Sequence, residues 1–167
     1  MKSTISSVLL SIGLMSHSAI AADTHQIELT IPQIATSKYQ RPFVAVWVEQ
    51  KGERKAVSTI SVWFDDKKWL KDIRRWWRKA GRYGQAVDGV TGATRAPGGY
   101  TLKWDGTDNQ GKALPAGEYT LYLEAVREHG DRTLLKQKVS LGKGQKVYKL
   151  DAGAELGPVS ISIGESK

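Results

Sequence analysis

One short segment, Asp88-Gly89-Val90-Thr91-Gly92-Ala93-Thr94, combines two hydroxyl groups and a carboxylate with several small residues. Thr94 follows Gly92 and Ala93, so its hydroxyl is sterically open and a second protein can reach it in an extended loop. Asp88 supplies a carboxylate that can orient a donor or help to hold a metal ion near a reacting phosphate. Because no general base adjoins either hydroxyl in the sequence, the segment suits the substrate of a modifying enzyme better than a self-sufficient active site.

The pattern Asp-x-x-Thr-Gly-Ala-Thr resembles the flavinylation signal that ApbE-type FMN transferases read. Targets of these enzymes include the FMN-bearing periplasmic subunits of sodium-pumping NADH:quinone reductases and of Rnf-type complexes. The resemblance implies that Thr94 receives FMN from FAD through a phosphoester bond, with Mg²⁺ supplied in the transferase. Asp88 matches the acidic position of the signal, Thr91 the small hydroxyl position, and Gly92 and Ala93 the small pair. The alternative is an ordinary glycine loop capped by Asp88.

The mature chain as a whole resembles a family of predicted periplasmic proteins of unknown function. The residues that carry this resemblance are Trp76-Trp77, Thr91-Gly92-Ala93-Thr94-Arg95, Trp104-Asp105-Gly106 and Arg127-Glu128-His129-Gly130. Such proteins look like partners of membrane-bound PepSY-type reductases and of the flavin transferase. The association is an analogy between families and does not establish an activity.

A tethered flavin also needs a surface for its flat, apolar ring, and aromatic faces suit such a ring. Trp77 and Tyr83 precede the motif closely and are candidate ring contacts. Trp76 and Trp77 point about 100° apart on a helix, so we expect one in the core and one at its edge. Arg95 follows the motif, and a guanidinium suits a phosphate group. The basic residues here equally suit a solvated helix face, an acidic redox partner or a membrane surface.

Strand-like patterns recur along most of the chain. Residues 26–31 alternate between apolar and polar side chains, which predicts a half-buried strand, and residues 43–48 are apolar on both faces, which predicts a central strand. The predicted strands cover residues 26–31, 43–48, 60–64, 100–104, 119–126, 133–139, 145–150 and 158–163. Short strands with frequent turn signals predict a mainly β fold, an antiparallel Ig-like β-sandwich. The stretch Trp104-Asp105-Gly106-x-Asp108 … Gly111 … Pro115-x-Gly117-x-Tyr119 is similar to the Ig-like domain of flagellar hook-capping proteins, which supports the sandwich.

One segment between these strands has a helical period. Its apolar stripe, which predicts one inserted helix over about 68–80, consists of Trp69, Ile73, Trp76, Trp77 and Ala80. Asp65-Asp66 precede this helix and are better interpreted as its cap than as a catalytic pair. Residues 83–97 follow as a glycine-rich loop that carries the motif.

The first residues predict an export signal. Residues 8–20 are mostly apolar, Lys2 precedes them, and Ala19-Ile20-Ala21 is a small-x-small cleavage site. The apolar stretch is too short and too polar to span a bilayer. We therefore expect a signal peptide over residues 1–21, cleaved after Ala21, and a single soluble periplasmic domain over residues 22–167.

Composition excludes several classes of function. The chain has 167 residues, a formal net charge of +8 and no cysteine, which excludes disulfide scaffolds, thiol catalysis and cysteine-based metal sites. Nucleic acid is the generic partner of a basic chain, but export and the lack of a recognised motif argue against it. His129 could ligate haem, although its setting in Glu128-His129-Gly130-Asp131 favours a hairpin tip. We expect no metal ligands and no catalytic residues.

Two hypotheses follow for the function. The first is an exported electron carrier with FMN esterified to Thr94. It would pass electrons from a membrane reductase to an extracytoplasmic acceptor, with ferric iron reduction as one use. The flavin would do the redox chemistry while the sandwich positions it, so the protein would be a carrier rather than an independent enzyme. The alternative is an unmodified Ig-like binding or assembly module of the periplasm.

Overall fold

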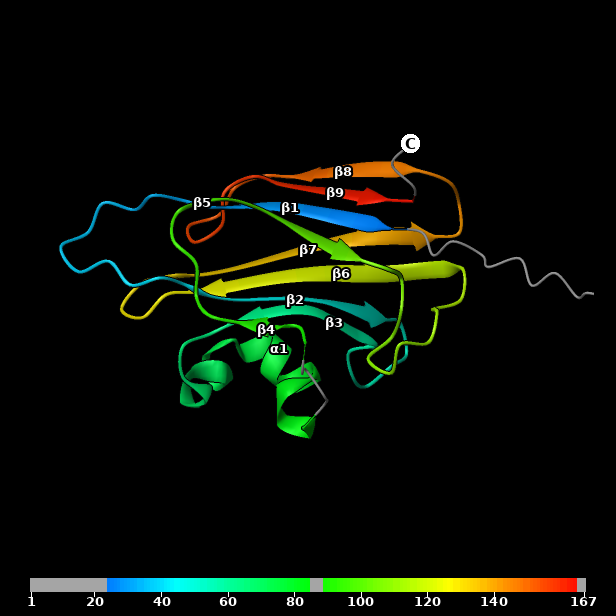
Figure 1. Ribbon diagram of the computed structural model, residues 1–167, viewed down its shortest axis with the longest axis horizontal. Coiled ribbons are helices and arrows are strands. Elements are labelled where there is room, and N and C mark those ends of the chain that lie inside the picture. Colours follow the sequence, from blue (N-terminus) through cyan, green and yellow to red (C-terminus); the bar gives the residue numbers. More distant parts are fainter. Residues whose placement is uncertain (1–23, 85–88, 165–167) are drawn as a thin grey trace, which may run out of the picture.

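The computed structural model describes residues 24–84 and 89–164, which contain nine strands in two sheets (Figure 1). The four-stranded sheet has the order β5 (Gly98–Trp104), β1 (His25–Ile31), β9 (Val159–Ile163) and β8 (Lys146–Leu150). The five-stranded sheet has the order β4 (Thr91–Gly92), β3 (Ser58–Trp63), β2 (Phe43–Gln50), β6 (Gly117–Val126) and β7 (Arg132–Leu141). Neighbouring strands are antiparallel, except that β4 runs parallel to β3. The predicted mainly β, sandwich-like fold is confirmed.

The main core lies between the two sheets. Ile27, Leu29 and Ile31 are buried and alternate with more exposed neighbours along β1, so one face of this strand packs inward. The neighbouring strand β9 shows the same alternation, and Ile27 lies opposite Ile161 in the register of the pair. The alternation of residues 26–31 in the sequence therefore predicted the inward face of β1 correctly.

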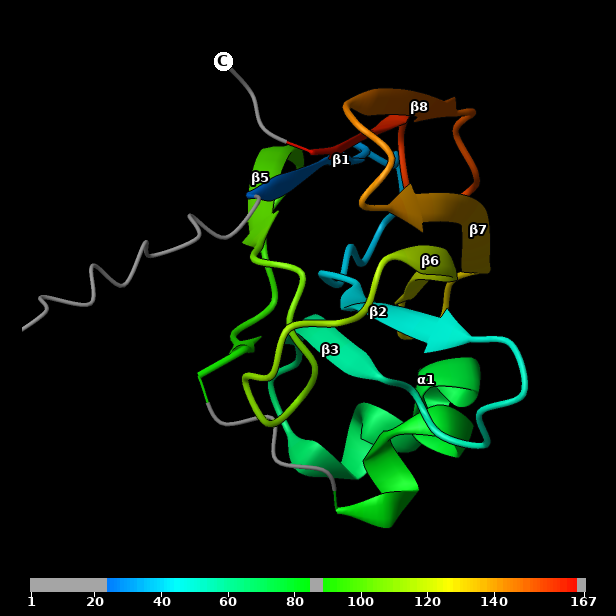
Figure 2. The same ribbon diagram turned by 90° about the vertical axis from the view of Figure 1, so that its right-hand side faces the viewer.

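A second apolar cluster covers the outer face of the five-stranded sheet. The helical segments on this face are η1 (Lys67–Asp72), α1 (Arg74–Lys79) and η2 (Gly81–Tyr83), of which η1 and η2 are 3₁₀ helices (Figure 2). Ile73, Trp76 and Ala80 pack in this cluster with Trp47 of β2. Strand β2 is buried almost throughout because it has the core on one face and the helices on the other, as its unbroken apolar run predicted.

The expectation of one continuous helix over residues 68–80 is wrong. The structure breaks it at Ile73, where the 3₁₀ turn η1 ends and α1 begins. The backbone N–H groups of Arg75 and Trp76 donate instead to Glu124 Oε2 of β6, at 3.0 and 3.1 Å. A carboxylate from another element thus replaces the carbonyl acceptors that a continuing helix would use. Trp76 is 1% exposed and Trp77 is half-buried, so the expected division of the pair is confirmed.

Glu124 itself is fully buried, at 0% exposure. Besides the two backbone groups of α1, its carboxylate accepts a hydrogen bond from Arg132 Nε at 2.6 Å. Arg75 reaches across the same face to Glu49, with Nε–Oε1 and Nη2–Oε2 distances of 3.1 and 2.9 Å. These charge-assisted contacts satisfy a carboxylate that would otherwise be costly to bury, and they fix the helical layer on the sheet.

We expect Glu124→Gln to lower the free energy of unfolding by about 2–3 kcal/mol, because the buried acceptor loses its charge while its donors remain. Urea unfolding followed by tryptophan fluorescence measures this loss. Glu118→Gln is the matched control: Glu118 lies on the same strand, but its side chain is 61% exposed, so the change should be small. Equal losses for the two variants would contradict the anchoring role of Glu124.

Candidate functional site

The motif segment lies at one edge of the sandwich, where the chain passes from the five-stranded to the four-stranded sheet (Figure 1). Strand β4 (Thr91–Gly92) lies beside Val62 and Trp63 of β3. Val62 N donates to Val90 O and Phe64 N donates to Gly92 O, each at 2.9 Å. The expectation of a loop throughout residues 83–97 is therefore wrong in part, since the motif includes a short edge strand.

Thr94 lies beside the residue that follows β3 by two positions, Asp65. Its hydroxyl donates a hydrogen bond to Asp65 Oδ1 at 2.7 Å, and its backbone N–H donates to the same oxygen at 3.4 Å. Thr94 is only 6% exposed, which corrects the expectation of an open hydroxyl. Asp65 thus places a carboxylate beside Thr94, a kind of group that the sequence does not place next to the motif. It lies 29 positions earlier, so no local spacing could have revealed it.

The other motif residues differ in their exposure. Thr91 and Ala93 are exposed, and Gly92 is half-buried beside Trp63. A Cβ on Gly92 would lie 3.7 Å from Trp63 Cδ1, which is an ordinary contact. Asp88 lies outside the described residues. The structure thus brings together Thr94, its two small neighbours and Asp65 at the end of β3.

Arg95 extends the site onto two aromatic rings that sequence reasoning did not assign to it. Its guanidinium carbon lies 4.6 Å from the centre of the Trp63 ring and 5.2 Å from that of Tyr100. The two rings meet edge to face at 5.4 Å, and Tyr100 Oη donates to Ala96 O at 2.7 Å. A cation over aromatic faces is attractive, so this stack holds residues 95–100 against the edge of the core.

The two aromatic residues expected near the flavin lie in the helical layer. Trp77 packs against the cluster on the outer face of the five-stranded sheet. Tyr83 Oη accepts a hydrogen bond from Arg82 Nη2 at 2.8 Å, and Lys55 Nζ lies 4.7 Å from the ring centre. The hydrogen bond from Arg82 lowers the pKa of Tyr83 below its usual value. Their role as ring contacts stays a prediction, whereas Trp63 and Tyr100 are the rings stacked with Arg95.

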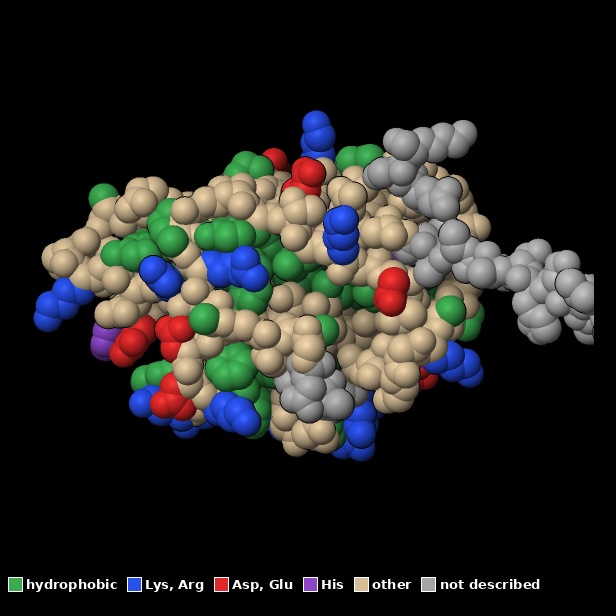
Figure 3. Space-filling model, viewed as in Figure 1, with side chains coloured by type: hydrophobic (Ala, Val, Ile, Leu, Met, Phe, Trp, Pro, Cys, Tyr) green, Lys and Arg blue, Asp and Glu red, His purple; other side chains and the backbone are tan. Residues whose placement is uncertain are grey.

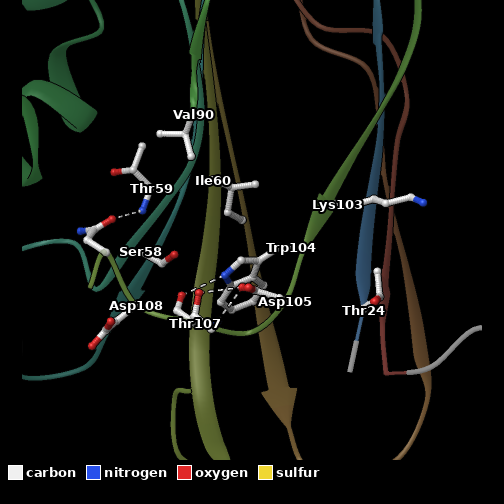
Figure 4. A pocket seen from close by; sticks show the side chains of 11 residues that line it. Thr24, Ser58, Thr59, Ile60, Val90, Lys103, Trp104, Asp105, Thr107 and Asp108 are labelled. Atoms are coloured by element: carbon white, nitrogen blue, oxygen red, sulfur yellow. Dashed lines mark hydrogen bonds between the residues drawn. The ribbon is translucent and has the colours of Figure 1, made fainter. Parts of the chain in front are cut away.

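A groove of about 450 Å³ opens between β3 and β5, and Val90 of the motif contributes to its lining. Figure 4 shows Ile60 pointing into it from β3 and Trp104 from β5. Trp104 Nε1 donates to Thr107 O at 3.0 Å, which fixes the indole. Figure 3 shows the same edge of the sandwich, with apolar side chains in a band between the two sheets.

The polar end of the groove is a turn that follows β5. Asp105 Oδ1 accepts hydrogen bonds from the hydroxyl and the backbone N–H of Thr107, at 2.7 and 3.1 Å. The hydroxyl bond is the main cause that lowers the pKa of Asp105 below its usual range. Asn109 Oδ1 accepts from Thr59 N at 2.7 Å and so ties the turn to the edge of β3.

His129 lies at the tip of the hairpin between β6 and β7, as expected, with a φ of 55° and a side chain that is 88% exposed. The buried pair of Arg127 and Glu155 supports this hairpin, with Nε and Oε2 3.0 Å apart. A Cβ on Gly130 would lie 2.6 Å from Arg127 Cζ, so a larger residue there would displace the guanidinium. In the described ranges, no group of three or more His, Cys, Asp or Glu residues could hold a metal ion.

Asp66 caps η1 by accepting a hydrogen bond from Lys68 N at 3.0 Å, as the sequence predicted for the Asp65-Asp66 pair as a whole. Its neighbour Asp65 has the different role of binding Thr94. The two adjacent carboxylates therefore have different partners, η1 for Asp66 and Thr94 for Asp65. Variants of the two residues can be compared to separate these roles.

We expect Thr94→Val to lower the free energy of unfolding by about 1–2 kcal/mol, because Asp65 loses a buried hydroxyl donor. Thr91→Val, at the exposed threonine of the same motif, should change it by no more than about 0.5 kcal/mol. Chemical denaturation of the unmodified proteins measures both values. Indistinguishable stabilities for the two variants would show that the Thr94–Asp65 contact contributes little in solution.

Comparison with known proteins places this architecture in a family. The family described as "Predicted periplasmic protein (DUF2271)" matches residues 24–158, which include β1 to β8, the helical layer and the motif. No curated protein and no solved structure matches the chain. Among the described residues, no helix is long and apolar enough to cross a membrane. The periplasmic location expected from the sequence agrees with the family description, and the chain belongs to this family of predicted periplasmic proteins.

Proposed function

We propose that this periplasmic protein is an electron carrier with FMN esterified to Thr94. The observation that carries the proposal is the 2.7 Å hydrogen bond from Thr94 Oγ1 to Asp65 Oδ1. Its donor is the last residue of the motif that resembles a flavinylation signal, and its acceptor is a carboxylate outside the motif that can take the hydroxyl proton. Proximity of a nucleophile and a base is the arrangement that phosphoryl transfer to a hydroxyl requires.

The attachment step can be written with this chain's atoms. Thr94 Oγ1 forms a bond to the FMN phosphorus of FAD, the bond from that phosphorus to the AMP oxygen breaks, and AMP leaves. The Oγ1 proton passes to Asp65 Oδ1, and no atom is oxidised or reduced. When bound, FMN supplies reversible electron transfer. Mg²⁺ and the remaining catalytic groups belong to the modifying enzyme, for which we propose an ApbE-type FMN transferase.

The buried state of Thr94 requires a small local rearrangement before modification. Strand β4, which leads to Thr94, is two residues long, and Ala93 and Arg95 on either side of Thr94 are exposed. Because both the N–H and the hydroxyl of Thr94 bond to Asp65, opening of this edge can expose the hydroxyl while it keeps its hydrogen bond to the carboxylate. Segments at an edge with few hydrogen bonds open at a low cost in free energy. The guanidinium of Arg95 then lies one residue from the phosphodiester, whose charge it suits.

The remaining partners rest on the family resemblance. We propose a PepSY-type membrane reductase as the electron donor and an extracytoplasmic acceptor, with ferric iron reduction as one use. The net charge of +8 and the exposed Arg74 and Arg78 of α1 suit an acidic partner or a membrane surface. Nucleic acid is not proposed as a partner, because export separates the protein from it.

A second candidate is an unmodified Ig-like binding module. The burial of the Thr94 hydroxyl favours it, since the hydroxyl already has a hydrogen-bond partner in the unmodified fold. In that case the groove between β3 and β5 would take a free ligand, and the motif would serve as an edge strand only.

Co-expression with an FMN transferase and export should add the mass of FMN less one water to the processed chain. We expect Thr94→Ala to abolish this addition and Thr91→Ala to retain it, because the phosphoester needs the Thr94 oxygen. Asp65→Asn should slow the addition several-fold, whereas Asp66→Asn should not, since Asp66 caps η1 instead. Intact-protein mass spectrometry and in-gel flavin fluorescence over time measure these rates.

Two results would overturn the proposal. One is a chain that stays unmodified when a known target of the same transferase is modified in the same cells. The other is full modification of Thr94→Ala, which would place the flavin on a different atom. Equal rates for Asp65→Asn and Asp66→Asn would leave the attachment standing but remove Asp65 from it.

A further inference from the structure

We infer that the groove between β3 and β5 is the seat of the isoalloxazine ring, an inference that rests on the proposed attachment at Thr94. The groove and the motif share one edge of the sandwich. Strand β3 links them directly: Ile60 lines the groove, Trp63 contacts Arg95, and Asp65 holds Thr94. A ring tethered at one end of this strand therefore finds an apolar hollow along the same strand.

The tether is long enough for this placement. Val90 lines the groove and lies four positions before Thr94. Extended chain rises by about 3.3 Å per residue, so the two residues are separated by at most about 13 Å. The extended ribityl phosphate arm together with the ring is longer than this separation. Attachment also raises the effective concentration of the ring at a nearby site, so a shallow groove can hold it.

The walls of the groove have the chemistry that a flat aromatic ring needs. Ile60 and Val90 offer aliphatic surface from one side, and Trp104 offers an indole from the other (Figure 4). Trp104 is held in place by its bond to Thr107 O and by the His25 ring, whose centre is 5.0 Å away. A rigid indole is suited to aromatic contact because little conformational freedom is lost on binding. The volume of about 450 Å³ falls within the range of small-molecule sites.

The polar end of the groove suits the opposite edge of the flavin. The pyrimidine part of isoalloxazine carries carbonyl acceptors and an N–H donor, whereas the dimethylbenzene part is apolar. Ser58 offers a hydroxyl and Asn109 an amide at the end of the groove near the turn. Asn109 Oδ1 already accepts from Thr59 N, which orients the side chain. Asp105 and Asp108 also line this end, and a carboxylate can accept a hydrogen bond from the ring N–H. The polar end of the groove therefore offers both donors and acceptors to the pyrimidine part of the ring.

A second hollow, of about 600 Å³, competes for the ring. It lies over β1, β5, β8 and β9 and includes Tyr100, which is close to Arg95 in the chain. Charged residues border both hollows, Glu28, Lys149 and Asp151 here and Lys103, Asp105 and Asp108 in the groove between β3 and β5. The motif separates the two hollows: Val90 lines the groove between β3 and β5, whereas no described residue of the motif lines the second hollow. The groove between β3 and β5 is thus the better seat.

The test uses the FMN-loaded protein and measures how far iodide reaches the flavin. In the folded wild-type protein we expect quenching several-fold weaker than for the same covalent flavin on the urea-unfolded chain. Val90→Asp, which puts a charge in the groove, should raise quenching toward the unfolded value. Thr101→Asp, at an exposed position that borders the second hollow, should leave it unchanged. Val90 is only half-buried, and its carbonyl bond to Val62 does not depend on the side chain.

A mutation-free measurement keeps the inference falsifiable if Val90→Asp fails to fold. NMR spectra of the wild-type protein with and without FMN should show ring-current shifts at the Ile60 methyl groups and at Trp104 Nε1–H. The exposed Val147 on β8 should not shift. Flavin that iodide reaches fully in the folded protein would overturn the groove as the binding site of the ring. So would quenching that rises in Thr101→Asp but not in Val90→Asp, or ring-current shifts at Thr101 instead of Ile60 and Trp104. A chain without added mass would overturn the attachment itself, and this inference with it.

Discussion

The fully buried carboxylate of Glu124 is the contact on which the arrangement of the site depends. It binds the first N–H groups of α1 and so holds the helical layer against the five-stranded sheet. With that layer in place, β3 is buried on both faces, with Val62 in the outer cluster and Trp63 in the core. A strand covered on both sides is a firm support for an edge strand and for the residue that follows it. Asp65 follows β3 by two positions, so its place beside Thr94 depends on this support.

Patterns confined to one element predicted that element well. Three features follow from which face of an element meets the core: the alternation along β1, the apolar run of β2, and the different burial of Trp76 and Trp77. The helix was predicted less well, because the break at Ile73 depends on an acceptor from β6. Helical period reports the buried face of a segment, and it carries no information about a competing hydrogen-bond partner elsewhere in the chain.

The site depended almost wholly on contacts between distant parts of the chain. The sequence marks Thr94 as a hydroxyl among small residues, and this pattern suggests an open loop. In the structure Thr94 is buried and bonded to Asp65, and Arg95 beside it stacks on Trp63 and Tyr100. The groove likewise exists because β3 and β5 belong to different sheets that part at this edge. No local spacing encodes any of these relations, so the sequence points to the proposed acceptor oxygen but not to its surroundings.

The edge of β3 has a consequence for aggregation of the folded protein. Strand edges with free backbone donors pair readily with other chains and seed aggregation, and β3 carries no charged side chain to prevent it. Here the donors of Val62 and Phe64 are taken by residues 90 and 92, and that of Thr59 by the side chain of Asn109. The opposite edge, β7, carries Lys136 and Lys138, whose charges deter such pairing. The motif segment therefore also acts as a cover that keeps a hydrophobic strand from templating intermolecular sheets.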